Sequence, residues 1–226
     1  MTRTPGPRGQ MSDSFLNAAF LTLSGGFQDA YTFCCRDGVF ANAQTGNLVR
    51  MGCSLMTGQW RTAAHFLLPL FAFIGGFACA GAVRRRFGSL RLLHWRQLIL
   101  LVEITLLLVS GFIPAGRSMP ANVMISFVCA LQIQAFRKVE GQAFATTMCI
   151  GNLRSGTEAL CAWLAGGGRA QRRRAAAYFG GICLFVVGAG IGGVVTAALG
   201  TRAIWLSCVL LLASFCLMLR RGPEAG

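Results

Sequence analysis

Residues 175–201, AAAYFGGICLFVVGAGIGGVVTAALGT, form a stretch without a single charged side chain. A helix needs about 20 apolar residues to cross the hydrocarbon core of a bilayer, and this stretch is longer. Residues 66–83 and 203–219 are also uncharged. Of the 226 residues, 54% are hydrophobic and only 12% are charged, whereas soluble domains carry about 25% charged residues. These patterns predict an integral membrane protein.

The net charge of +14 comes from arginines in short segments beside the apolar stretches, at 84–96, 169–174 and 220–221. Short loops rich in Arg and Lys are typical of the cytoplasmic side of a membrane. A nucleic-acid interface would instead need this charge on one folded face, with polar side chains that read base edges. We therefore exclude nucleic acid as a partner. We predict a multi-pass protein of a bacterial inner membrane with both termini in the cytoplasm.

The predicted fold is an all-α, polytopic membrane helix bundle with six full crossings and two re-entrant or broken segments. The crossings are expected at 14–34, 62–83, 97–113, 119–136, 175–199 and 202–220. Residues 1–13 are expected to form a cytoplasmic tail, residues 14–221 a single transmembrane domain, and residues 222–226 a C-terminal tail.

The two unusual segments, 39–59 and 142–167, are too polar to face lipid. Each could be a crossing buried inside the bundle, or could enter and leave the membrane on one side. Broken backbone at membrane depth is tolerated only where it is buried or lines a cavity. The charge pattern favours re-entry, because two full crossings would place the arginines of 84–96 and 169–174 on opposite sides.

The sequence also contains a weak internal repeat. Gly46-Asn47-Leu48 is echoed by Gly151-Asn152-Leu153, and Ala30 matches Ala135 at the same offset. The halves are about 14–113 and 119–220, each with three crossings and one re-entrant segment. Three is odd, so the second half is predicted to be inverted. Many transporters have such an inverted repeat and bind solute where interrupted helices meet.

Four short motifs show similarity to a known family. They are GFQDAYTF at 26–33, GVF at 38–40, QTGNLV at 44–49 and GNLRSG at 151–156. Together they resemble the signature of the YoaK family of bacterial membrane proteins, and the resemblance covers nearly the whole chain after the tail. It implies an inner-membrane protein and does not imply a particular chemistry.

Two acids lie inside predicted crossings, where an ionised carboxylate costs at least about 2.5–3.5 kcal/mol. Asp29 is the candidate ligand for a solute or cation; alternatively it bonds to backbone groups or to Arg36. Glu103, midway along 97–113, is the candidate proton carrier; alternatively it is a neutral acid bonded to a neighbouring helix. Evolution has no stability reason to keep an acid at such a position.

The two unusual segments supply further candidates. Asn47 and Asn152 are expected to approach the membrane midplane from opposite sides and to bind a polar solute, or else to cap broken helices. Further polar side chains are expected to line the same cavity: Gln28, Gln44, Thr45, Gln132 and Gln134.

Other features have structural explanations. Gly76 with Ala80 and Gly188 with Gly192 are small-residue pairs that let helices pack closely. Glu158 is expected to pair with Arg154 one turn away. The ten cysteines lie in or at the ends of apolar stretches and lack metal-ligand spacing, so we expect no metal site and no cofactor.

These observations favour a transporter or channel for a small polar solute or ion. The alternative is a non-transporting membrane scaffold or sensor. A membrane-embedded enzyme is less favoured, because the sequence has no nucleophile motif, metal cluster or phosphate-binding loop. The expected partners are the lipid bilayer and the solute, and a homo-oligomer is a further expectation.

Overall fold

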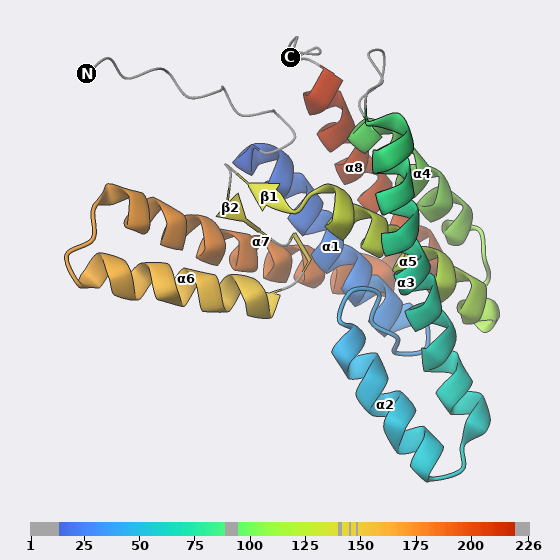
Figure 1. Cartoon of the computed structure of the whole chain (residues 1–226). Helices are drawn as coiled ribbons and strands as arrows, with labels where there is room; N and C mark the ends of the chain where they lie inside the picture. Colours follow the sequence, from blue (N-terminus) through green and yellow to red (C-terminus); the bar gives the residue numbers. More distant parts are fainter. Residues whose placement is uncertain (1–13, 89–94, 140–141, 145, 148, 220–226) are drawn as a thin grey trace.

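The computed structural model describes residues 14–88, 95–139, 142–144, 146–147 and 149–219. This part of the chain is built almost entirely of helices (Figure 1), which confirms the all-α class. The α-helices are α1 (Phe15–Cys35), α2 (Gln44–Met56), α3 (Trp60–Phe87), α4 (Trp95–Gly111), α5 (Ser118–Ala135), α6 (Cys149–Leu164), α7 (Arg169–Leu199) and α8 (Trp205–Leu219). The 3-10 helices η2 (Ala115–Arg117) and η3 (Gly200–Ile204) precede α5 and α8, and two-residue strands β1 (Lys138–Val139) and β2 (Gln142–Ala143) pair between α5 and α6. The predicted tails, 1–13 and 222–226, and Arg91 lie outside the described residues.

Each of the six predicted crossings falls on a helix. Three helical stretches are long and apolar enough to cross a membrane: Trp60–Phe87, Ala115–Ala135 and Arg169–Leu219. Large apolar side chains such as Phe71 and Val194 are exposed along α3 and α7. Extensive exposed apolar surface is unfavourable in water and indicates a lipid environment. The structure therefore supports a membrane protein, and six full crossings stay a prediction.

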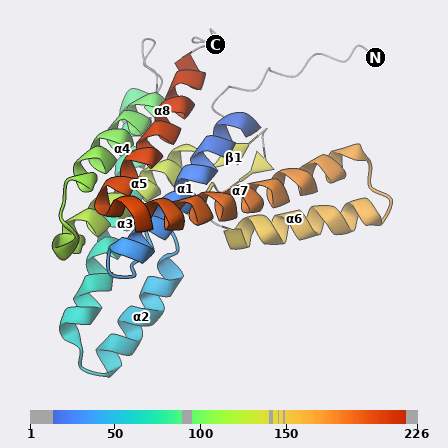
Figure 2. The same ribbon diagram turned by 180° about the vertical axis from the view of Figure 1, so that it is seen from behind.

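In each half of the chain the third helix is the longest and the first helix is the second longest. Helices α1 to α4 contain 21, 13, 28 and 17 residues, and α5 to α8 contain 18, 16, 31 and 15. The second and third helices of each half form a hairpin closed by a glycine with positive φ, Gly58 or Gly166. The α2–α3 and α6–α7 hairpins project away from the bundle in different directions (Figures 1 and 2).

The packing also repeats between the halves. Helix α1 packs along α7, and α5 packs along α3, so the first helix of each half lies on the third helix of the other. Likewise α1 contacts α8 and α5 contacts α4. Two interleaved repeats would pack in this way, which agrees with the repeat read from the sequence. Inversion of one half relative to the other stays a prediction.

Glycines allow these exchanged helices to approach closely. A Cβ on Gly188 of α7 would collide with the carbonyl of Leu23 in α1, and one on Gly192 would lie 2.9 Å from the carbonyl oxygen of Phe27. A Cβ on Gly76 of α3 would collide with the carbonyl of Phe127 in α5. The predicted role of these small residues in close packing is confirmed.

Replacing Gly188 with alanine should therefore destabilise the protein. The added methyl group would have to push α1 and α7 apart, and overpacking of this kind costs about 1–3 kcal/mol. Gly193 lies on the same helix, and a Cβ there would meet nothing within 4 Å. In thermal unfolding of the detergent-solubilised protein, Gly188→Ala should melt below wild type, and Gly193→Ala should not. Equal melting of the two variants would contradict this packing.

Candidate functional site

Helices α2 and α6 each begin after a non-helical segment, residues 36–43 in the first case and the described residues between α5 and Cys149 in the second. We call these two segments the breaks. Each unusual segment is predicted to contain a break near its Gly-Asn pair, Gly46-Asn47 or Gly151-Asn152, and the structure places the non-helical residues a few positions before each pair. Both pairs lie in the first turn of a continuous helix. The non-helical residues therefore precede each helix and do not interrupt it.

The amide of Asn47 explains this arrangement. Its Oδ1 accepts a hydrogen bond from the backbone N–H of Phe40 (3.0 Å), and its Nδ2 donates to the Phe40 carbonyl (2.6 Å) and to Gln44 Oε1 (3.0 Å). Gln44 in turn donates to the carbonyl of Ala41 (2.9 Å). These bonds hold the non-helical segment against the start of α2. They favour the capping interpretation of Asn47 over solute binding. Asn152 is buried in the first turn of α6.

Asp29 anchors the segment before α2 to the middle of the bundle. Its Oδ1 accepts the backbone N–H of Asn42 at 2.7 Å, and the N–H groups of Ala41 and Ala43 also bond to this carboxylate. Asn42 donates from Nδ2 to the carbonyl of Gly25, one turn before Asp29 (3.2 Å). Asp29 is only 6% exposed. The bond to a backbone N–H is the arrangement that the structural alternative for Asp29 predicts.

The segment before α6 reaches the same turn of α1. A Cβ on Gly25 would lie 2.5 Å from Thr147 Cγ2 and 3.5 Å from the carbonyl oxygen of Thr146. Gln132 of α5 fixes this segment, because its Nε2 lies 3.2 Å both from the Leu21 carbonyl and from Thr146 Oγ1. The two chain breaks therefore meet on α1, where Gly25 leaves room for both.

Buried oxygen atoms without partners gather at this meeting point. Asn42 Oδ1 and Thr147 Oγ1 have no hydrogen-bond partner among the described residues, and each residue is only 5% exposed. Thr22 Oγ1, one turn before Gly25, is also buried and unpartnered. Leaving such a group unsatisfied costs about 1–3 kcal/mol. An amide oxygen accepts hydrogen bonds and a hydroxyl accepts or donates them, so this lining suits a cation or a solute with N–H or O–H donors.

A second polar cluster lies deeper in the bundle, between α1, α5 and α8. Gln28 donates from Nε2 to Ser24 Oγ and Ser207 Oγ, both at 2.9 Å, and its Oε1 accepts the Cys129 thiol at 3.0 Å. The two serine hydroxyls are 2.7 Å apart. We call these four residues the Gln28 cluster. Glu103 of α4 is 1% exposed, and neither of its carboxyl oxygens has a partner among the described residues.

Thr45 and Gln134 do not join either group. Thr45 is exposed and Gln134 is half-buried, and no hydrogen bond of the described residues links them to Asp29. Sequence reasoning instead overlooked Asn42 and Thr147 as individual candidates. A signal was available, because each stands five residues before the asparagine of a Gly-Asn pair.

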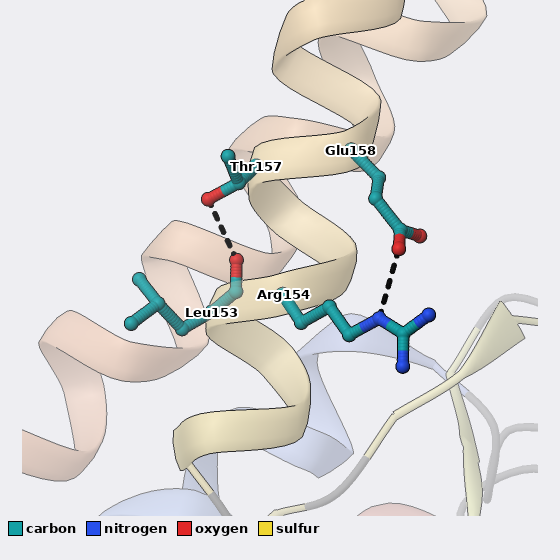
Figure 3. A network of polar contacts seen from close by, with 4 residues as sticks. All are labelled: Leu153, Arg154, Thr157 and Glu158. Carbon is teal, nitrogen blue, oxygen red and sulfur yellow. Dashed lines mark hydrogen bonds and ion pairs between the residues drawn. The ribbon is translucent and has the colours of Figure 1, made fainter.

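The predicted pair on α6 is confirmed and lies outside the site. Arg154 Nε donates to Glu158 Oε1 at 2.9 Å, and the two side chains are 82% and 61% exposed (Figure 3). Thr157 bonds back to the carbonyl of Leu153 on the same helix (2.9 Å). Exposed pairs of this kind contribute little to stability.

Long apolar helices surround two non-helical segments that carry buried polar side chains, and this combination is typical of a helical membrane protein. The chain belongs to the family described as "Protein of unknown function (DUF1275)", whose model matches residues 17–217. No curated protein and no solved structure matches the chain.

Proposed function

We propose that the protein is a transporter or channel for a small polar solute or ion. The observation that carries this proposal is the convergence of two chain breaks on Gly25, with the unpartnered oxygens of Asn42 and Thr147 beside it. Non-helical backbone at membrane depth occurs where it is buried or lines a cavity. In many transporters such breaks form the solute site near the midplane.

The proposal includes the membrane arrangement. Six crossings in a bacterial inner membrane, with both termini cytoplasmic and the halves inverted, would bring the breaks together from opposite sides. The exchanged packing of α1 on α7 and α5 on α3 supports this arrangement. Membership of the YoaK group within the family is part of the same proposal.

The lining of the site narrows the class of solute. The unpartnered atoms at the meeting point are oxygens, and the Asp29 carboxylate adds an acid that accepts hydrogen bonds from backbone N–H groups of the first break. Oxygen ligands suit hard cations and solutes that donate N–H or O–H bonds. A cation or a donor-rich neutral solute therefore fits better than an anion.

The test is flux through the purified protein in liposomes, measured against a panel of small polar neutral solutes and monovalent cations. For any solute that crosses faster than in empty liposomes, Thr147→Val should slow the flux about tenfold, which corresponds to about 1.4 kcal/mol. The substitution removes the hydroxyl and keeps the methyl group that packs on Gly25.

Thr157→Val is the matched control, because that hydroxyl is exposed on α6 and bonds only within its own helix. It should leave flux unchanged. If no member of the panel crosses faster than in protein-free liposomes, the scaffold or sensor alternative is favoured instead.

A further inference from the structure

Glu103 occupies an unusual place on α4. It faces the bundle interior with both carboxyl oxygens unpartnered among the described residues. The neighbouring residue, Ile104, accepts a hydrogen bond through its carbonyl from the Cys208 thiol of α8 (3.8 Å). This contact places the middle of α4 against α8 next to Ser207, a member of the Gln28 cluster. Cys129, another member, lies within electrostatic range of both Glu103 and Asp29.

Because neither carboxyl oxygen of Glu103 has a hydrogen-bond partner among the described residues, no arginine or lysine in that part of the chain bonds to it. Arg36, directly after α1, donates to the carbonyl of Ser110 in the last turn of α4 and to those of Ile113 and Pro114 just after it, and so is occupied at the helix end. Arg96, on the same helix as Glu103, lies over the ring of Trp95. On the helices packed against α4, the Cys129 thiol of α5 lies within electrostatic range of Glu103 and of Asp29, and the Cys208 thiol of α8 donates to the Ile104 carbonyl. Arg84 of α3 lies over the ring of Trp95 at the start of α4.

An ionised carboxylate in these surroundings would carry a desolvation penalty of several kcal/mol with nothing to offset it. A protonated carboxyl removes that penalty and gains an O–H donor. The Gln28 cluster, which adjoins the contact of α4 with α8 at Ile104, contains two serine hydroxyls that can rotate to receive or give a hydrogen bond. A leucine would pack here at lower cost, so stability alone does not account for an acid at this position.

We propose that Glu103 is a proton-binding site inside the bundle, which takes up one proton to form the neutral acid and releases it as the carboxylate. The exchange involves no electron transfer and no partner other than water. Its coupling to solute movement rests on the proposed function, whereas the proton site itself does not.

The first test uses N,N′-dicyclohexylcarbodiimide, an apolar reagent that adds to protonated carboxyl groups from within the membrane. The carboxyl oxygen bonds to the carbodiimide carbon, and the carboxyl proton moves to a carbodiimide nitrogen. The full-length protein in liposomes should gain one adduct that maps to Glu103, and labelling should slow as pH rises. Glu103→Gln should lose this adduct. Glu158→Gln, which removes an exposed acid, should keep it.

The second test is infrared difference spectroscopy between low and high pH, which needs no reagent access. The wild type should show a carbonyl band of a buried protonated carboxyl that disappears at high pH, and Glu103→Gln should lack it. Spectra without this band, or identical in the two proteins, would overturn the proposal. Neither readout depends on flux. A positive result without any solute flux would therefore support the proton site and contradict the proposed transport. Solute flux without a proton site at Glu103 would instead indicate a passive pathway.

Discussion

Replacing Arg36 with methionine should destabilise the protein by at least about 3 kcal/mol, because three carbonyls at the end of α4 would each lose a charged donor. Arg36 is fully buried. Its Nη2 donates to the carbonyls of Ser110 (2.9 Å) and Ile113 (2.8 Å), and its Nη1 to that of Pro114 (3.0 Å). The last carbonyls of a helix have no helical partner and carry partial negative charge. Arg36 therefore ties the end of α1 to the end of α4.

Arg50→Met provides the matched control. Arg50 is an exposed arginine that donates to the carbonyl of Gly38 (2.6 Å) and lies over the ring of Phe33. We expect thermal unfolding in detergent to show a large loss for Arg36→Met and a small one for Arg50→Met. Arg36→Lys should fall between wild type and Arg36→Met, because an ammonium keeps the charge without the planar fork. Similar melting temperatures for the two methionine variants would mean that Arg36 is not a structural cap.

The helices were predictable because long apolar stretches leave few alternatives in a membrane. The predicted crossing 14–34 corresponds to α1 (Phe15–Cys35) within one residue at each end. Helix α3 extends beyond the predicted 62–83 at both ends. Its last turn contains Arg84, Arg85 and Arg86, and arginine is a good helix former whose charge can lie beyond the apolar layer. Hydropathy therefore locates the apolar part of a helix rather than its ends.

The partners of buried polar groups were not predictable in the same way. Asp29 is conspicuous in the sequence as an acid within an apolar helix, but its acceptor role depends on the backbone of residues 41–43, whose path hydropathy does not describe. Arg36 is adjacent in sequence to a natural acidic partner, Asp37, yet it bonds to carbonyls far along the chain. Such pairings follow from tertiary packing, which a single sequence does not reveal.

The predicted membrane arrangement can be tested through the lysine content of the chain. Lys138 is the only lysine in the sequence, so Lys138→Arg gives a background in which an introduced lysine can be followed. Arg85→Lys and Arg172→Lys keep the positive charge at exposed positions in the two basic segments. Arg117→Lys does the same in the exposed turn before α5, which is predicted to lie outside.

We expect a membrane-impermeant amine reagent, followed by peptide mapping, to give an all-or-none result. In intact spheroplasts only the lysine at position 117 should react, and in inside-out vesicles only those at 85 and 172. Short arginine-rich segments stay on the cytoplasmic side. The start of α1, the end of α3 and the end of α8 also lie toward one end of the bundle (Figure 1).

If positions 85 and 172 reacted from opposite sides of the membrane, the predicted inversion of the second half relative to the first would be wrong. Segment 142–167 would then cross the membrane completely, because it is the only one of the two unusual segments that lies between positions 85 and 172. If both crossed, each half would contain four crossings, and an even number leaves two repeats parallel rather than inverted. The breaks before α2 and α6 would then approach Gly25 from the same side of the membrane. In the inverted arrangement the two breaks approach one solute site from opposite sides, as in many transporters with interrupted helices, so this labelling result would remove the two-sided site proposed here and leave a one-sided polar pocket.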